Sequence, residues 1–287
     1  MATPIETASE KSQPSLAAET IEFYREAMQT LENAGVPFLV GGAYAFARYT
    51  GIKRYTKDFD IFVRPADYER ALDTFMEKGW QTERSFPHWL GKTLRGEDFV
   101  DVIFSSGNGV ARVDDLWFEK AVEGKVLDLP VRLIPVEEMI WSKSFIMERE
   151  RFDGADVAHL LYCRAADLDW ERLLGRFDAN GGWRVLFAHL VLFGYIYPGD
   201  AGRIPRHVLE GLTDRLRQDA PDPATDPLLC RGPILSRSQY LIDIYRWGYQ
   251  DARLRPAGNM SVEEIEQWTV AAEEDGDVTQ YQALEDG

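Results

Sequence analysis

The stretch from Pro37 to Val63, PFLVGGAYAFARYTGIKRYTKDFDIFV, constrains the fold more than any other part of the chain. It begins as a strand that enters a tight turn at Gly41 and Gly42 and then a helix, and it ends with Asp58 and Asp60 beside an apolar run. Alternate side chains of a strand share a face, so the two carboxylates point the same way. They repel each other unless a cation lies between them. A hard, oxygen-binding cation such as Mg²⁺ suits this arrangement.

A glycine turn that opens a helix presents backbone N–H groups to an anion such as phosphate. Gly41 and Gly42 also allow a close approach because they have no Cβ. Farther along, the apolar strand Phe99–Phe104 is interrupted by Asp101. Burying that carboxylate is costly unless it is paired or binds metal. Three aspartates on neighbouring strands can hold two Mg²⁺ ions for displacement at phosphorus. The pattern therefore predicts nucleotide chemistry.

Gly41-Gly42, Asp58-Phe59-Asp60 and Asp101 together resemble the nucleotidyltransferase superfamily with the DNA-polymerase-beta-like fold. Within it, the chain is similar to bacterial stand-alone members, which include abortive-infection toxins of toxin–antitoxin systems and antibiotic-modifying enzymes. Ala43 departs from the pattern, because many members have Ser after the glycines. The resemblance implies that Asp58, Asp60 and Asp101 bind two Mg²⁺ ions and that the substrate is an NTP, with ATP among the candidates.

Basic residues gather just before the aspartate pair, among them Arg54 and Lys57. The resemblance implies that one of these two side chains neutralises the triphosphate. A solvated loop explains the same residues equally well.

A second group of charged residues lies in EEMIWSKSFIMERERFDGADVAHLL: Glu138, Lys143, Arg151, Asp153 and Asp156. The toxin-type nucleotidyltransferases have a similar segment. The resemblance implies that Lys143 contacts nucleotide phosphate and that Asp153 or Asp156 orients the nucleotide or the acceptor. The alternative is a pair of amphipathic helices with surface salt bridges, each of which would contribute little to stability.

Hydrophobic periodicity predicts an α+β fold. A mixed-sheet nucleotidyltransferase domain with helices on one face is expected over residues 16–135, and an all-helical domain over 136–275. Residues 1–15 are expected to be a flexible N-terminus and 276–287 an acidic tail. Within these parts, 126–134 is expected to be one strand and 236–252 one helix.

Two details of the helical part are also predicted. Ser261 and Glu264 have the spacing of a capping box at the start of the last helix. His189 lies in an apolar helix and is expected to be packed and hydrogen-bonded rather than to bind a ligand.

The chain has 48 Asp and Glu against 32 Lys and Arg, a net charge of −16. Such a charge disfavours binding to DNA, although a local basic pocket for tRNA remains open and a cationic small molecule would be attracted. Cys163 and Cys230 lack the spacing of a disulfide scaffold or zinc site. With no signal peptide and no apolar run of membrane-spanning length, a cytoplasmic location is expected.

The resulting hypothesis is transfer of NMP from an NTP to an acceptor hydroxyl, with release of pyrophosphate and with the helical domain closing over the nucleotide. The acceptor is a small molecule or tRNA. One alternative is a toxin-type enzyme that acts on tRNA or protein and has an antitoxin partner. Another is a nucleotide-binding or scaffold protein without turnover. Dinucleotide and P-loop motifs are absent from the sequence.

Overall fold

The structure, a computed structural model, describes residues 16–54, 56–218 and 226–274. The expected flexible N-terminus and the acidic tail lie outside the described residues. Eleven elements precede residue 135: α1 (Ala18–Asn33), β1 (Leu39–Val40), α2 (Gly42–Thr50), β2 (Asp60–Phe62), α3 (Tyr68–Glu77), β3 (Gln81–Phe86), β4 (Leu90–Arg95), β5 (Asp98–Ile103), α4 (Asp115–Glu119), β6 (Val122–Val126) and β7 (Leu129–Leu133).

The strands form one seven-stranded sheet in the order β3-β4-β5-β2-β1-β7-β6. β1 pairs parallel with β7 and β2 pairs parallel with β5, whereas the other neighbours are antiparallel. The mixed sheet predicted from the sequence is confirmed.

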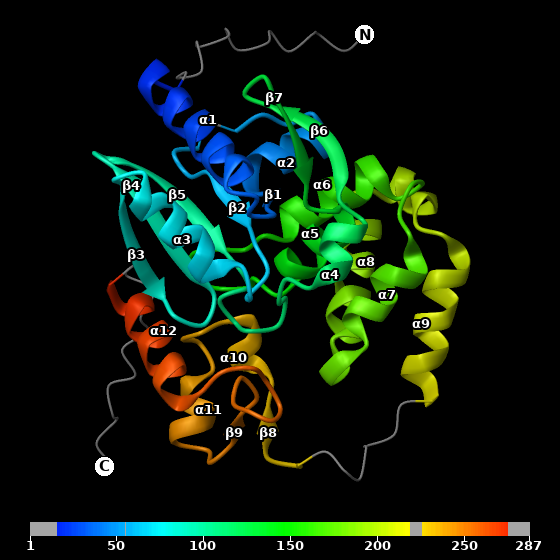
Figure 1. The fold of residues 1–287 in the computed structure, drawn as a ribbon. Helices are drawn as coiled ribbons and strands as arrows, with labels where there is room; N and C mark the ends of the chain where they lie inside the picture. Colours follow the sequence, from blue (N-terminus) through cyan, green and yellow to red (C-terminus); the bar gives the residue numbers. More distant parts are fainter. Residues whose placement is uncertain (1–15, 55, 219–225, 275–287) are drawn as a thin grey trace, which may run out of the picture.

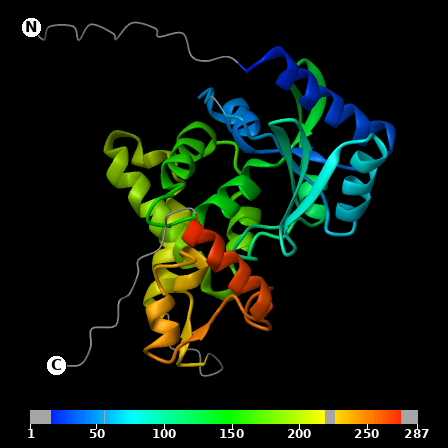
Figure 2. The same cartoon turned by 90° about the vertical axis from the view of Figure 1, so that its left-hand side faces the viewer.

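α1 and α3 lie side by side across one face of this sheet (Figures 1 and 2). Their apolar side chains meet the strands through aromatic contacts. Tyr24 of α1 stacks on Phe59 with ring centroids 4.7 Å apart, and Phe23 meets Trp80 edge-on at 4.9 Å. Because Phe59 lies between Asp58 and Asp60, its burial under α1 turns the two carboxylates to the opposite face.

The prediction of a single strand over residues 126–134 is wrong, because β6 and β7 form a hairpin there. Leu127 and Asp128 make the turn with φ values of 46° and 67°. Such turns are normally recognised by Asn-Gly or Asp-Gly. Here a distant residue stabilises the turn: Arg25 of α1 donates to the Leu127 carbonyl at 2.7 Å and to the Asp128 carboxylate at 2.9 Å.

The remainder of the described chain is mainly helical, as predicted, with two short strands in addition. Its elements are α5 (Val136–Ser144), α6 (Gly154–Arg164), α7 (Trp170–Phe177), the 3₁₀ turns η1 (Ala179–Gly181) and η2 (Pro198–Arg203), α8 (Trp183–Ile196), α9 (Arg206–Gln218), β8 (Leu229–Cys230), α10 (Gly232–Leu235), α11 (Leu241–Tyr245), β9 (Gln250–Asp251) and α12 (Val262–Glu274). No helix within the described ranges has the length and apolar character needed to cross a bilayer.

The predicted helix over residues 236–252 is wrong, because helix α11 covers only five residues. Gly248 has φ of +75°, a conformation that ends a helix. The chain then continues as β9, which pairs with β8. Figure 2 shows this part, from α10 to α12, lying below the sheet and the larger helices.

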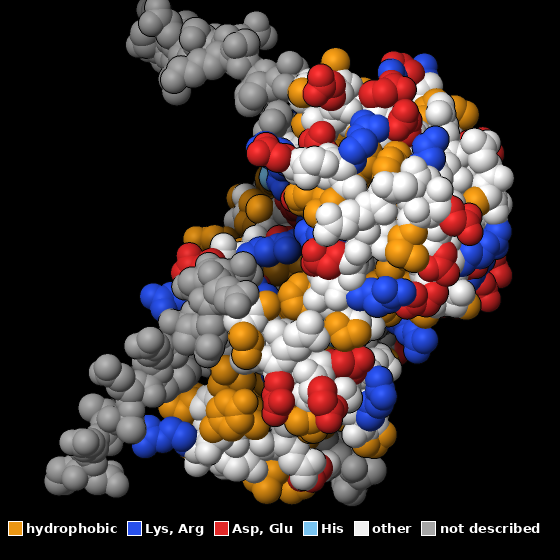
Figure 3. Space-filling model, turned by 60° about the vertical axis from the view of Figure 1, so that its left-hand side comes forward, with side chains coloured by type: hydrophobic (Ala, Val, Ile, Leu, Met, Phe, Trp, Pro, Cys, Tyr) orange, Lys and Arg blue, Asp and Glu red, His pale blue; other side chains and the backbone are white. Residues whose placement is uncertain are grey.

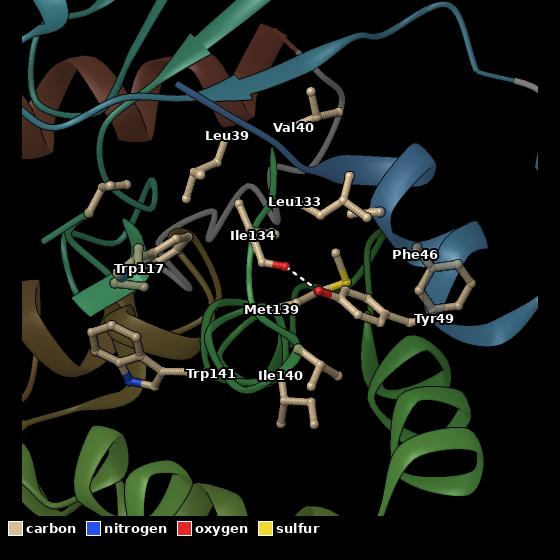
Figure 4. Packing of buried hydrophobic residues seen from close by; sticks show 14 of the residues in the cluster. Leu39, Val40, Phe46, Tyr49, Trp117, Leu133, Ile134, Met139, Ile140 and Trp141 are labelled. Atoms are coloured by element: carbon tan, nitrogen blue, oxygen red, sulfur yellow. Dashed lines mark hydrogen bonds between the residues drawn. The ribbon is translucent and has the colours of Figure 1, made fainter. Parts of the chain in front are cut away.

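One continuous apolar core joins the sheet to the helices (Figure 4). Leu39 and Leu133 from the strands pack with Met139 and Ile140 of α5. The Tyr49 hydroxyl of α2 donates to the Ile134 carbonyl at 2.6 Å, so the polar end of this buried ring is satisfied. The predicted division into two domains near residue 135 stays a prediction.

Glu138 of α5 is completely buried. It accepts hydrogen bonds from Arg172 Nη1 at 2.7 and 2.5 Å and from Arg176 Nε at 3.0 Å, both on α7. The sequence grouped Glu138 with Lys143, but the structure pairs it with these two arginines instead. A buried carboxylate between two guanidinium groups fixes α5 against α7, because separating the charges would leave them unpaired in the interior.

We therefore expect Glu138→Gln to lower the free energy of unfolding by about 2 kcal/mol, since both arginines lose the buried carboxylate that they share and keep only Glu137 or Asp114 as a partner. Urea unfolding followed by circular dichroism measures this change. Arg206→Gln, which breaks the exposed pair with Glu210, is the matched control and should change stability by less than about 0.5 kcal/mol. Equal effects of the two substitutions would contradict a structural role for the buried pair.

Candidate active site

Three aspartates lie at one wall of a cavity of about 300 Å³. The parallel pairing of β2 with β5 puts Asp60 directly opposite Asp101. Asp58 lies two residues before Asp60 on the same chain segment, and all three side chains line the cavity. The structure thus brings together the three carboxylates that the sequence predicted to act together.

The glycine turn fits closely around this wall. Gly42 has φ of +53°, and a Cβ there would lie 1.7 Å from Asp60 Oδ2. A Cβ on Gly41 would lie 2.2 Å from the Phe62 ring, and the Gly41 N–H donates to the Asp60 carbonyl at 3.0 Å. Both positions therefore require glycine for packing against β2. Gly42 also lines the cavity, whereas Gly41 does not.

The opposite wall carries a network of charged side chains. Lys143 Nζ of α5 lies 2.7 Å from Asp153 Oδ2 and 2.8 Å from Asp156 Oδ2. Arg54 Nη2 contacts Asp156 Oδ1 at 2.5 Å, and Arg151 Nε lies 3.4 Å from Asp153 Oδ1. Lys143, Asp153 and Asp156 are largely sheltered from solvent, whereas Arg54 and Arg151 are exposed. Because the contacts link three segments, they form a connected network rather than the isolated surface salt bridges of the alternative interpretation.

The charged residues that the sequence singled out near the nucleotide differ in their position relative to the cavity. Lys143, Arg151 and Asp153 line the cavity. Arg54 and Asp156 lie behind that lining, where Arg54 reaches Lys143 only through Asp156. Lys57 is exposed and its side chain is not part of the lining.

The electrostatics of the two walls differ. Burial, together with the charges of Asp101 and Asp58, raises the pKa of Asp60 to about 7. Burial also raises the pKa of Asp101, although Lys92 partly offsets it. On the other wall, burial acts to raise the pKa of Asp153, but Lys143 and Arg151 outweigh it and hold that pKa below its usual range. The aspartate wall therefore has Lys92 as a partial offset to its carboxylates, whereas the other wall carries Lys143 and Arg151 beside Asp153.

Two contributions to the site were missed in the sequence, one from a residue next to the lining and one from the lining itself. Lys92 of β4 pairs with Asp101 across the sheet, with Nζ 3.3 Å from Oδ1. Its only sequence signal is its place on a strand that neighbours β5. Trp268 of α12 meets Trp89 with ring centroids 5.3 Å apart, and both line the cavity. No local pattern connects residues so distant in the sequence.

The aspartate wall offers the oxygen donors that a hard cation prefers. Asp101 Oδ1 is buried, and its contact with Lys92 Nζ at 3.3 Å lacks hydrogen-bond alignment, so this oxygen keeps acceptor capacity that a cation could use. Among the described residues, however, no three His, Cys, Asp or Glu side chains are already arranged to hold a metal ion. The donor chemistry fits a divalent cation, and the ligand set Asp58, Asp60 and Asp101 stays a prediction.

The chain was compared with curated protein sequences and with solved structures. No curated protein sequence matches the chain. Among solved structures, it is similar to a nucleotidyltransferase-like protein from Paracoccidioides brasiliensis at 14% identity and TM-score 0.43, covering 66% of this chain and 95% of that one. It is also similar to the antibiotic-resistance factor ANT(2″)-Ia at 12% identity and TM-score 0.37, with 71% of this chain and 94% of that chain covered. A third similar structure is the lincosamide antibiotic adenylyltransferase LnuA, at 14% identity and TM-score 0.35, with 51% of this chain and 98% of that chain covered.

The family described as nucleotidyl transferase of unknown function (DUF2204) matches residues 20–171. This range contains the glycine turn, the three aspartates, Lys92 and the network around Lys143. It is more than half of the chain. By this match the chain belongs to that family of nucleotidyltransferases.

Proposed function

We propose that this nucleotidyltransferase transfers NMP from an NTP to the hydroxyl of a small-molecule acceptor in a metal-dependent reaction. The observation that carries the proposal is the register of β2 and β5, which sets Asp60 beside Asp101 at a cavity that Lys143 faces from α5. A carboxylate wall opposite a cationic wall suits a substrate whose phosphates are accompanied by a divalent cation.

In this proposal Asp58, Asp60 and Asp101 would hold divalent cations, with Mg²⁺ the leading candidate. The bound metal would supply charge neutralisation of the phosphates. The acceptor oxygen attacks the α-phosphorus, and the bond from that phosphorus to the β-phosphate oxygen breaks as pyrophosphate leaves. The Asp101 carboxylate accepts the proton from the acceptor hydroxyl. Catalysis comes from positioning and charge, because no covalent intermediate with the protein is needed.

The cationic wall would bind the triphosphate. Lys143 and Arg151 line the cavity and are held in place by Asp153. Arg54 would act on the nucleotide through Asp156, which holds Lys143, and the exposed Lys57 would make at most an outer contact. Gly42 would offer its backbone to phosphate beside Asp60, with Gly41 supporting the turn.

A small acceptor is preferred over tRNA because of the charges around the site. The first cavity has five acidic residues in its lining, namely Asp58, Asp60, Asp101, Glu148 and Asp153, against three basic ones. On the face drawn in Figure 3, acidic and basic side chains are interspersed rather than gathered into a basic field. A polyanion needs such a field. A toxin-type enzyme with an antitoxin, and a protein without turnover, are the alternatives that an assay would separate.

We expect Asp58→Asn and Asp101→Asn each to reduce transfer at least about 100-fold, because each removes a charge that the reaction needs. The assay uses α-³²P-labelled NTPs with Mg²⁺ and a panel of small hydroxyl compounds, total tRNA and protein lysate. Asp73→Asn makes the same chemical change on the exposed side of α3 and should retain full activity.

If only tRNA or protein becomes labelled, the hypothesis of a small-molecule acceptor is wrong and the toxin-type hypothesis is supported. If both variants stay as active as Asp73→Asn, the aspartate wall is not the catalytic centre. Metal-dependent NTP binding without any labelled product would favour the protein without turnover.

The raised pKa of Asp60 gives a second prediction, for the protein in EDTA. Below about pH 4 Asp60 is protonated in both the folded and the unfolded protein, and its contribution to stability is fully present. Between pH 4 and pH 7 the unfolded chain ionises Asp60 while the folded protein keeps it protonated beside Asp101 and Asp58, so this contribution is progressively lost and is gone above the folded pKa of about 7. Asp60→Asn removes the ionisation.

The variant should therefore be more stable than the natural protein at pH 8 by roughly 2 kcal/mol, allowing for water that reaches the half-buried carboxylate. Urea unfolding of both proteins at pH 5, 6, 7 and 8 measures the difference. A constant difference across this range would show that Asp60 does not titrate there. Asp73→Asn again serves as the control and should show no pH-dependent gain.

A further inference from the structure

A second cavity, of about 340 Å³, adjoins the first. Its walls come from α5, from the turn between α7 and α8, from α10 and from residues 257–259. The two cavities share four lining residues: Asn108, Phe145, Ile234 and Leu235. A ligand in the second cavity would therefore lie against the wall of the first.

The second cavity has the opposite charge character from the rest of the molecule. Its lining contains two arginines, Arg176 and Arg231, and no Asp or Glu. Arg176 is neutralised by Glu138 and Asp114. Arg231 is exposed and has no ion pair within the described ranges. In a chain of net charge −16, this leaves one available cation in a cavity without carboxylates.

The remaining walls are aromatic and apolar, with Trp141, Phe145 and Tyr240 among them. The Trp141 side chain is almost fully buried, and its Nε1–H has no acceptor in the described part of the chain. Figure 4 shows this nitrogen turned away from Trp117 and Ile134. Because this nitrogen itself is buried, Trp141 contributes apolar ring surface to the wall rather than a donor that a ligand could reach.

Glycines give these walls their shape. Gly181 has φ of +73°, and Gly232 packs so closely under Tyr240 that a Cβ would lie 2.2 Å from its ring. The Tyr240 ring therefore packs directly on the backbone of Gly232, which only glycine allows.

We infer that the second cavity binds a flat, largely apolar group that carries one anionic or strongly hydrogen-bond-accepting substituent. This inference rests on the proposed function, for which the group would be the non-reacting part of the acceptor, held next to the site where the hydroxyl reacts. The absence of Asp and Glu from the lining disfavours a polycation in this cavity. The acidic first cavity and the basic second cavity thus select different ends of one acceptor.

The test uses 8-anilinonaphthalene-1-sulfonate, whose rings and sulfonate match this chemistry and whose fluorescence rises in apolar surroundings. We expect one saturable site on the folded protein. Arg231→Gln should weaken binding about tenfold, since a charge-assisted contact is lost. Val185→Trp, which fills the cavity from α8, should abolish it. Dye binding should stay unchanged in two control variants. These are Arg246→Gln, at an exposed arginine outside the lining, and Trp89→Phe, in the first cavity.

A second probe, N-phenyl-1-naphthylamine, has similar rings without the sulfonate. Its binding should be blocked by Val185→Trp and unaffected by Arg231→Gln. Unfolding of a variant cannot imitate these results, because exposed apolar surface increases dye fluorescence. Unchanged binding in Val185→Trp, or weakening by Trp89→Phe to the same extent as by Arg231→Gln, would overturn the inference.

Titration with Mg²⁺ and ATP then tests the relation to the reaction. The sulfonate dye and the nucleotide should be able to bind to the protein at the same time, because they occupy neighbouring cavities. Displacement of the dye by ATP would place the dye in the first cavity and refute the proposed site. The dye titrations require no turnover, so they give a result even if the protein transfers no nucleotide.

Discussion

The parallel pairing of β2 with β5 determines where the carboxylates of the proposed site lie. It sets Asp60 and Asp101 on neighbouring strands at one level, facing the same cavity. The approach is close enough that Gly42 has no room for a Cβ beside Asp60. The glycine turn and the aspartate pair, which look like two separate motifs in the sequence, are therefore one packing unit. A change in either would displace the other.

The second wall depends on how α5 is fixed. Glu138 anchors one side of this helix to Arg172 and Arg176, while Lys143, less than two turns later, reaches Asp153 and Asp156 of the next helix. The apolar contacts of Met139 and Ile140 with the sheet join the two walls. Positioning of this kind is what electrostatic catalysis at phosphorus requires, since the charges must be in place before the substrate arrives.

Local patterns predicted much of this arrangement. The Asp58-Phe59-Asp60 alternation gave the correct face, because the period of a strand is a local property. The capping box is also as predicted: the Glu264 carboxylate accepts from the Ser261 N–H at 2.6 Å, and the Glu264 N–H reaches the Ser261 hydroxyl at 3.3 Å. His189 is buried and its Nε2 lies 2.9 Å from the Ser144 carbonyl, in agreement with the packed role. Lys92, Trp268 and the turn at Leu127 were missed because each depends on a partner distant in sequence.

The same limit applies to the second cavity, whose walls come from segments between residues 108 and 259. From the net charge we expected that a cationic small molecule would be attracted, with a local basic pocket for tRNA left open. An average over the whole chain cannot describe a cavity whose lining excludes every acidic residue. Acceptor choice in such an enzyme depends on the local walls, because buried charges act over short distances and surface charges are screened. For the proposed acceptor site, Arg231 in the lining therefore matters more than the net charge of −16 of the whole chain.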